Sequence, residues 1–194
     1  HHRVKNNLQI ISSLISLEFE NLENKEAIKV LSETRRRIEA IALVHQKLHQ
    51  DSNFNKVDIL PYIEDLMAIQ QFVNPKVICS LKSPDIVVDL DVAVPLGLII
   101  SEIVTTSLKH AFNNVDSPKL EVQLSINEGK VELLLKDNGV GLPDGFDLNK
   151  PDSLGFEIVT ALIAQIDGQI TSFNNQDGGT CFKITFEHKS KNSN

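Results

Sequence analysis

The sequence predicts an α+β protein in which a helical hairpin is followed by a two-layer α/β sandwich. Two observations support this fold class. Apolar residues recur three or four positions apart over about the first fifty residues, which is the period of an α-helix. The rest of the chain alternates short apolar strand candidates with longer helical segments, and a loop rich in Gly, Pro and Asp interrupts it.

The hairpin is expected to consist of helices at residues 4–22 and 25–50, separated by a short polar break at residues 21–24. A break of this length joins antiparallel helices. Both apolar stripes would stay largely exposed in an isolated hairpin, so we expect partner helices from a second copy of the chain. The stripe of the first helix comprises Val4, Leu8, Ile11, Leu14, Ile15 and Leu17.

The α/β part is expected to begin near residue 55. Its elements are a helix at residues 57–72, strands at 76–82 and 86–89, a long buried helix at 91–112, strands at 120–126 and 131–136, a helix at 154–166, and strands at 169–173 and 180–187. Asn-Glu-Gly at residues 127–129 predicts a hairpin turn. Helices on one side of a mixed, mostly antiparallel sheet give the sandwich. We therefore expect a hairpin domain at 1–54, an α/β domain at 55–188 and a polar tail at 189–194.

Composition excludes several classes of function. The net charge of -7 argues against nonspecific nucleic-acid binding, which depends on Lys and Arg neutralising phosphates. Cys79 and Cys181 are far apart and lack metal-ligand spacing, so two reduced thiols in the cytoplasm are expected. No apolar run is expected to span a bilayer. Because the chain opens on His1 without an initiator Met, we interpret it as a piece of a longer protein.

A DxGxG motif closes one strand and opens the loop at residues 138–153. Asp137 at the strand end can accept a hydrogen bond from an exocyclic amine such as that of adenine. Gly139 and Gly141 let the backbone turn with positive φ and approach a ligand closely. An ordinary exit from a strand into a turn is the alternative interpretation.

Two further glycine motifs are weaker signals. In Ser-Leu-Gly-Phe at residues 153–156 a loop meets the start of a helix, where unpaired N–H groups near Leu154 and Gly155 favour phosphate oxygens. Gly-Gly-Thr at residues 178–180 enters the last strand and ends on Thr180. Many helices and turns have these sequences without binding a ligand.

Polar residues also lie on the long apolar helix. Glu102, Thr106, Lys109 and His110 are spaced so that a carboxylate, a hydroxyl and basic groups occupy neighbouring turns. Such a stripe could hold a metal-bound triphosphate. A solvated helix face is the alternative, although the apolar neighbours leave little room for solvent.

His2 begins the hairpin, and helical spacing puts Asn6 one turn later on the same side. A neutral imidazole is a competent nucleophile toward a γ-phosphoryl group, and its pKa makes the neutral form available near pH 7. Taken without its context, the histidine could equally be a surface residue or the remnant of a tag.

The order of these motifs resembles that of the sensor histidine kinases, in the branch whose phosphoacceptor segment reads like His-Arg-Val-Lys-Asn-Asn-Leu-Gln, which stands at residues 2–9. The resemblance covers nearly the whole chain. It implies a dimeric helical hairpin joined to a Bergerat-type ATP-binding domain. It also implies Mg-ATP as phosphoryl donor, and a response regulator whose aspartate receives the phosphoryl group.

Site residues follow from this resemblance one by one. His2 would be the phosphoacceptor, with Asn6 its polar neighbour and Glu102 the third catalytic residue. Glu102 and Thr106 would hold magnesium. The nucleotide would be bound by Glu102, Thr106, Lys109, His110, Asp137, Gly139, Gly141, Leu154, Gly155 and Thr180.

The chain departs from the family pattern at Thr106, where the family normally has the Asn that binds magnesium, and at Ser101, where an Asn is common. Arg3 also stands where many histidine kinases have an acidic residue. A Thr hydroxyl also reaches Mg²⁺ in other nucleotide sites. The alternatives are therefore a degenerate, weakly active or scaffold homologue, and an unrelated ATPase of the same superfamily, which leaves His2 unexplained.

Overall fold

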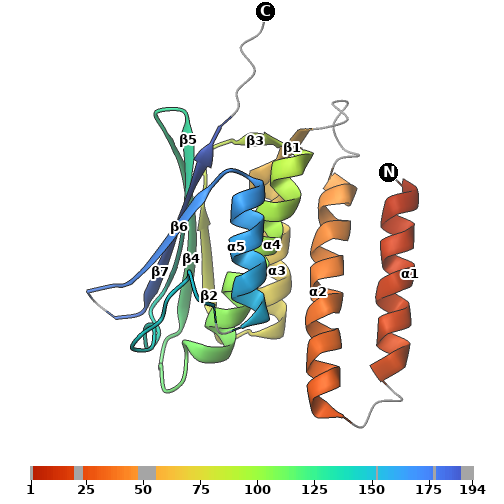
Figure 1. The fold of residues 1–194 in the computed structure, drawn as a ribbon, viewed down its shortest axis with the longest axis horizontal. Helices are drawn as coiled ribbons and strands as arrows, with labels where there is room; N and C mark the ends of the chain where they lie inside the picture. Colours follow the sequence, from red (N-terminus) through yellow and green to blue (C-terminus); the bar gives the residue numbers. More distant parts are fainter. Residues whose placement is uncertain (1, 20–23, 48–55, 152, 177, 189–194) are drawn as a thin grey trace, which may run out of the picture.

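The computed structural model describes residues 2–19, 24–47, 56–151, 153–176 and 178–188, and these form successive layers (Figure 1). A twisted sheet forms one side. Helices α3, α4 and α5 cover one face of it, α2 packs on the outside of α4, and α1 packs on α2. The predicted order, a helical hairpin followed by an α/β sandwich, is confirmed.

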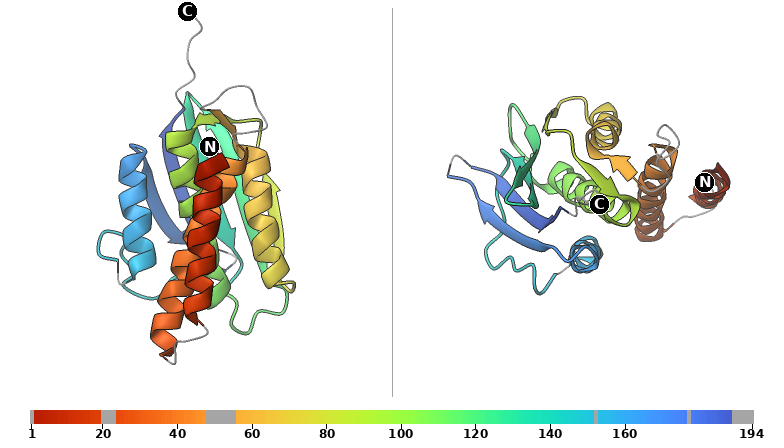
Figure 2. Two further views of the ribbon diagram at one scale, coloured as in Figure 1. Left: turned by 90° about the vertical axis from the view of Figure 1, so that its right-hand side faces the viewer. Right: turned by 90° about the horizontal axis from the view of Figure 1, so that it is seen from above.

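The hairpin consists of α1 (His2–Phe19) and α2 (Lys25–Lys47), which run antiparallel (Figure 2). Asn24 caps α2, because its Oδ1 accepts hydrogen bonds from the backbone N–H groups of Glu26 and Ala27 at 2.9 and 3.3 Å. The predicted ends of both helices, residues 20–22 and 48–50, lie outside the described residues. Most apolar side chains of α1 are exposed, whereas Ala40 and Val44 of α2 are buried.

The main sheet has the strand order β2-β4-β5-β7-β6. Its strands are β2 (Ile78–Lys82), β4 (Lys119–Asn127), β5 (Lys130–Asp137), β6 (Gln169–Asn174) and β7 (Thr180–Glu187). The β2–β4 pair is parallel and the other pairs are antiparallel, so the expected mixed, mostly antiparallel sheet is confirmed. Burial alternates along β4 and β5, which therefore present one apolar face to the helices.

The covering helices are α3 (Ile59–Val73), α4 (Leu90–His110) and α5 (Leu154–Gln165). Asp58 caps α3 and Ser153 caps α5 through side-chain oxygens that accept backbone N–H groups. Among the described residues, α4 alone is long and apolar enough to cross a membrane, which the sequence expectation overlooked. Most of this stretch is buried between the sheet and α2, so α4 is the core helix of the domain.

The start of the helix predicted at residues 57–72 was wrong. Residues Lys56–Asp58 form a short strand, β1, which pairs antiparallel with β3 (Val87–Asp89). Val57 is apolar and buried, so in the sequence it looks like part of the helix that follows. Asp58 is the last residue of the strand and also caps the helix. This short ladder joins the segment after the hairpin to the start of α4.

Candidate functional site

A cavity of about 540 Å³ opens where the C-terminal end of α4 meets the end of β5, the start of β7 and the loop at 138–153. Five residues singled out from the sequence line it: Thr106, His110, Asp137, Gly141 and Thr180. The topology brings them together because β5 and β7 are neighbours and the C-terminal end of α4 meets the turn after β5.

Asp137 is a buried polar group of the cavity, and its residue is only 6 % exposed. One oxygen, Oδ1, accepts the backbone N–H of Gly139 at 2.9 Å and that of Thr180 at 3.1 Å. The other, Oδ2, accepts the hydroxyl of Ser107 at 3.1 Å. A carboxylate has about four acceptor positions. Three fixed donors therefore orient the carboxylate and leave one acceptor position for a ligand amine.

Two glycines permit this arrangement. A Cβ on Gly139 would lie 2.3 Å from the carbonyl oxygen of Ala111, so the turn after β5 could not pack against the end of α4. Gly179 has φ +84°, and its Cβ would lie 2.0 Å from the carbonyl oxygen of Asp137. Side chains at these positions would push Thr180 and the loop away from Asp137.

An aromatic cluster forms the apolar wall of the cavity. Phe146 of the loop lies 5.2 Å from Phe156 and 6.4 Å from Phe182, both edge to face, and Phe156 lies 5.6 Å from Phe182. These residues were not assigned to the site from the sequence, although Phe146 in a loop rich in Gly, Pro and Asp was an available signal. The cluster anchors the loop to α5 and β7 and supplies apolar area for a flat ring.

The start of α5 forms the other end of the site. Ser153 caps the helix, Leu154 is exposed, and a Cβ on Gly155 would lie 3.0 Å from Oε2 of Glu102. The unpaired N–H groups of this helix start therefore lie close to the Glu102 carboxylate. Lys150 lines the cavity from the loop and adds a positive charge.

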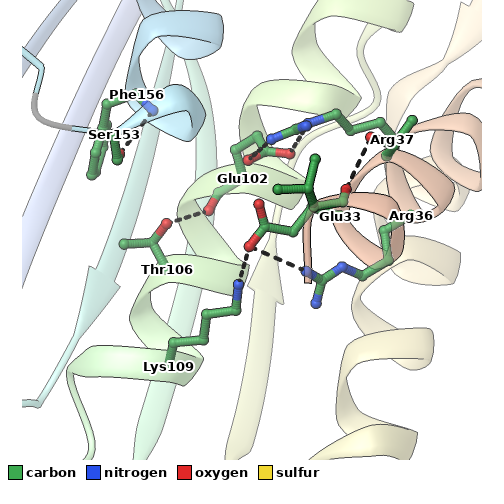
Figure 3. A network of polar contacts seen from close by, with 10 residues as sticks. Glu33, Arg36, Arg37, Glu102, Thr106, Lys109, Ser153 and Phe156 are labelled. Atoms are coloured by element: carbon green, nitrogen blue, oxygen red, sulfur yellow. Dashed lines mark hydrogen bonds and ion pairs between the residues drawn. The ribbon is translucent and has the colours of Figure 1, made fainter. Parts of the chain in front are cut away.

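Glu102 and Lys109 do not line the cavity but pair with α2 (Figure 3). Arg37 makes two parallel bonds to Glu102, from Nε to Oε1 at 2.7 Å and from Nη2 to Oε2 at 3.0 Å. Lys109 donates to Glu33 at 2.6 Å. Burial raises the pKa of Glu33, but Lys109 and the nearby Arg36 and Lys29 outweigh it and hold the pKa below its ordinary value.

Thr106 lies between these two groups of residues. Its hydroxyl donates to the carbonyl oxygen of Glu102 at 2.8 Å, and its side chain lines the cavity. Because the hydroxyl proton is engaged by the backbone, the lone pairs of Oγ1 stay available to a cation. Among the described residues no group of three His, Cys, Asp or Glu could hold a metal. A single hydroxyl oxygen suits Mg²⁺, which usually takes few protein ligands and the rest from phosphate and water.

His2 and Asn6 are not brought near the cavity. Both belong to α1, which packs on α2, and α2 lies between α1 and α4 (Figures 1 and 2). Asn6 is exposed and lines a shallow groove on the surface of α1. The described arrangement thus keeps the predicted acceptor apart from the predicted nucleotide site.

Family models match almost the whole chain. Residues 1–71 match the HisKA_2 family, described as histidine kinase, and residues 91–190 match the HATPase_c family, described as histidine kinase-, DNA gyrase B- and HSP90-like ATPase. The chain belongs to the histidine kinase family. It thus carries the ATP-binding domain and the phosphoacceptor region of two-component signalling, and the resemblance seen in the sequence is confirmed.

Relatives extend over both parts of the kinase. The sensor histidine kinase PdtaS of Mycolicibacterium smegmatis is 34% identical over 188 residues, which is 93% of this chain and 37% of the relative. The blue-light-activated histidine kinase 2 of Erythrobacter litoralis is 28% identical over 92% of this chain and 52% of the relative. The chain thus spans about a third to a half of the length of these curated relatives.

Solved structures agree on the fold. The histidine kinase domain of the Erythrobacter litoralis EL346 blue-light activated histidine kinase superposes with a TM-score of 0.73 at 23% identity. The match covers 96% of this chain and 88% of that domain. Hairpin and sandwich together therefore match a known kinase architecture.

Proposed function

We propose that this chain is the core of a sensor histidine kinase that transfers the γ-phosphoryl group of Mg-ATP to His2 and then to an aspartate of a response regulator. We assign residues 1–54 to dimerisation and phosphoacceptance and residues 55–188 to ATP binding and catalysis, with residues 189–194 as a tail. The use of ATP and the free thiols of Cys79 and Cys181 favour the cytoplasm.

The observation that carries the proposal is the buried, oriented carboxylate of Asp137 in an apolar-walled cavity of about 540 Å³. Its open acceptor position suits the exocyclic amine of adenine, and Phe146 and Phe182 offer apolar area to the ring. Guanine presents a carbonyl oxygen in place of that amine, and two acceptors would repel. Recognition of adenine by this group therefore favours ATP over GTP. Gly139, Gly141 and Thr180 act by shaping this end of the site.

We assign the phosphate end to the helix start at Leu154 and Gly155, with His110 and Lys109 as hydrogen-bond donors to phosphate oxygens. Thr106 would hold Mg²⁺ through Oγ1, together with Glu102 once its carboxylate is free of Arg37. Bound magnesium would neutralise charge on the transferring phosphoryl group. The chain's own contribution is to position the triphosphate and to exclude water with the loop at 138–153.

In the transfer step a neutral nitrogen of His2 attacks the γ-phosphorus, the bond to the bridging oxygen breaks, and ADP leaves with the negative charge. The phosphorylated ring then loses its remaining N–H proton to water or to a base, for which Glu102 is our candidate. Asn6, one turn along α1, would orient the ring. The step needs α1 and the nucleotide site to approach each other, so the α/β domain must move relative to the hairpin.

Dimerisation through the hairpin is supported by the apolar side chains that α1 leaves exposed. Ile10, Leu14 and Leu17 are each more than half exposed, at 58%, 57% and 59%. A contiguous apolar helix face of this kind is a place for partner helices. Sedimentation analysis should give a dimer, and Leu14→Glu should shift it to monomer, whereas Glu26→Gln on the exposed start of α2 should leave it unchanged.

The kinase assignment is tested by incubating the protein with γ-labelled ATP and Mg²⁺. Acid-labile, base-stable label should appear on the wild type and on His1→Ala, and should disappear on His2→Ala. Equal labelling of His2→Ala, or no acid-labile label on the wild type, would contradict the proposal. A purified response regulator added afterwards should remove the label from the kinase.

A degenerate kinase is the second candidate, and Thr106 is the observation that favours it. If a shorter side chain than Asn cannot hold magnesium, nucleotide binding should be insensitive to Mg²⁺. The measurement is nucleotide affinity with Mg²⁺ and with a chelator. Tighter binding with Mg²⁺ excludes this candidate.

A further inference from the structure

The hairpin contacts the ATP-binding domain through charged residues of the nucleotide-facing helix. Arg37 and Glu33 of α2 lie one turn apart, and they pair with Glu102 and Lys109 of α4 (Figure 3). The hydroxyl of Tyr62 on α3 also donates to the carbonyl oxygen of Ala40 on α2 at 3.3 Å. Among the described residues, these two ion pairs and this buried hydrogen bond connect α2 to the domain, beside the buried apolar side chains of Ala40 and Val44.

The Arg37–Glu102 pair differs from an ordinary surface ion pair. The two side chains are 15% and 14% exposed, and both carboxylate oxygens are bonded to the guanidinium. A bidentate pair with so little solvent is stronger and geometrically more restrictive than an exposed one. While it is formed, each oxygen of Glu102 accepts one hydrogen bond from the guanidinium, and a metal ion on the same carboxylate would face that positive charge. The ammonium group of Lys109 is likewise held by Glu33 rather than by a phosphate.

The pair also lies at the phosphate end of the site. Oε2 of Glu102 lies 3.0 Å from the Cβ position of Gly155, and the carbonyl oxygen of Glu102 accepts the hydroxyl of Thr106. The guanidinium of Arg37 therefore binds the carboxylate that faces the start of α5. By contrast, the three groups that hold Asp137 all belong to the ATP-binding domain itself.

The arrangement that these contacts hold is unsuited to transfer. The second helix of the hairpin lies between α1 and the domain that carries the cavity (Figures 1 and 2). In Figure 1, α1 begins at the end of the molecule where β1 and β3 lie, whereas α5 begins at the opposite end. The His2 end of α1 and the phosphate end of the site are thus remote from each other.

We propose that Arg37 and Glu33 form an autoinhibitory latch that competes with the magnesium-bound triphosphate for Glu102 and Lys109. In the latched state the domain stays docked on α2 and the phosphoacceptor is out of reach. Binding of Mg-nucleotide and opening of the latch favour each other, because linkage is reciprocal. A signal that shifts α2 relative to α4 would then control the kinase by breaking one bidentate pair. This inference rests on the proposed function of Glu102 and Lys109.

The latch is tested by calorimetry with a non-hydrolysable ATP analogue and Mg²⁺. Arg37→Gln removes the bidentate pair and should tighten binding about fivefold or more. Arg37→Lys, which keeps the charge but not the parallel bonds, should show a smaller gain, and so should Glu33→Gln. Lys25→Gln is the control on the same helix, since Lys25 is exposed in the first turn of α2. It should bind like the wild type.

Small-angle X-ray scattering of the nucleotide-free variants supplies a second readout that does not depend on catalysis. Arg37→Gln should have a larger radius of gyration than the wild type and Lys25→Gln, because the domain leaves α2. Equal or weaker nucleotide binding by Arg37→Gln, or an unchanged radius of gyration, overturns the latch. Failure of the proposed function would give another result: no variant would bind the nucleotide, or no acid-labile label would form on His2.

Discussion

The two ends of the candidate nucleotide site are built differently. At one end Asp137 receives three hydrogen bonds, all from its own domain, and two glycines hold the turns that donate them. At the other end Glu102 receives both its side-chain hydrogen bonds from Arg37 on the hairpin. The first end is preorganised wherever the hairpin lies. The second depends on where the hairpin lies.

This difference separates recognition from catalysis. The base of a nucleotide can be bound in every arrangement of the two parts, since none of the donors around Asp137 lies on α2. In the proposed mechanism, use of the triphosphate requires Glu102 and Lys109, which pair with Arg37 and Glu33 of α2 in this arrangement. A kinase built in this way can stay loaded with nucleotide while its transfer step is controlled by the hairpin.

Asp137→Asn should produce the largest effect, a loss of nucleotide affinity of about ten- to a hundredfold, as expected for a hydrogen bond to a charged group. The Asn oxygen can still accept the N–H groups of Gly139 and Thr180. The Asn NH₂ group then points toward the ligand amine, so that two donors face each other. Asp116→Asn, an exposed control, should bind normally. Calorimetry with ADP measures both. An unchanged affinity of Asp137→Asn for ADP would show that Asp137 does not bind the adenine amine.

Thr106→Asn should have a smaller effect, restricted to the phosphate end. A longer amide reaches a cation without an intervening water, so affinity for the Mg-bound ATP analogue should rise severalfold, within the ~1.4 kcal/mol that corresponds to tenfold. Affinity measured with a chelator present should not change. An equal change with and without Mg²⁺ would mean that Thr106 acts on the fold rather than on the metal.

Tyr62→Phe should weaken docking by about 0.5–1.5 kcal/mol, the usual net contribution of one hydrogen bond. Burial raises the pKa of Tyr62, so its hydroxyl stays protonated and donates to Ala40 throughout the neutral range. The expected result is a modest gain in affinity for the Mg-bound analogue, smaller than that of Arg37→Gln. Thermal unfolding should show that the domain itself remains folded. Weaker nucleotide binding would contradict a docking role.

Lowering the pH should have the smallest effect on docking, through protonation of Glu33. Its pKa in the folded chain lies below the ordinary value of 4.5, so its contribution to docking is fully present above about pH 4.5 and is lost as pH falls through the lowered pKa. The groups that face it are Lys109, Arg36 and Lys29. Wild type and Glu33→Gln should differ in thermal stability by under about 1 kcal/mol at pH 6 and converge as the pH falls through the lowered pKa of Glu33. A difference that persists at low pH would exclude this origin.

The sequence predicted the fold class, the sheet composition and the residues around Asp137 because these depend on local patterns. Apolar periodicity marked α4, and glycines marked the turns that need positive φ or close approach. It could not predict the partners of Glu102 and Lys109, since Arg37 and Glu33 are 65 and 76 residues away along the chain and look like part of a solvated helix face. Ser107 was missed because a small polar residue on a buried helix has no pattern of its own.

The most direct test compares two ligands on Arg37→Gln and the wild type, adenosine without metal and the non-hydrolysable ATP analogue with Mg²⁺. Adenosine uses only the Asp137 end, whereas the analogue uses both ends. The structure predicts equal affinities of both proteins for adenosine and tighter binding of the analogue by Arg37→Gln. Equal shifts for both ligands, or no shift for either, would contradict the distinction between a preorganised adenine end and a phosphate end controlled by the hairpin.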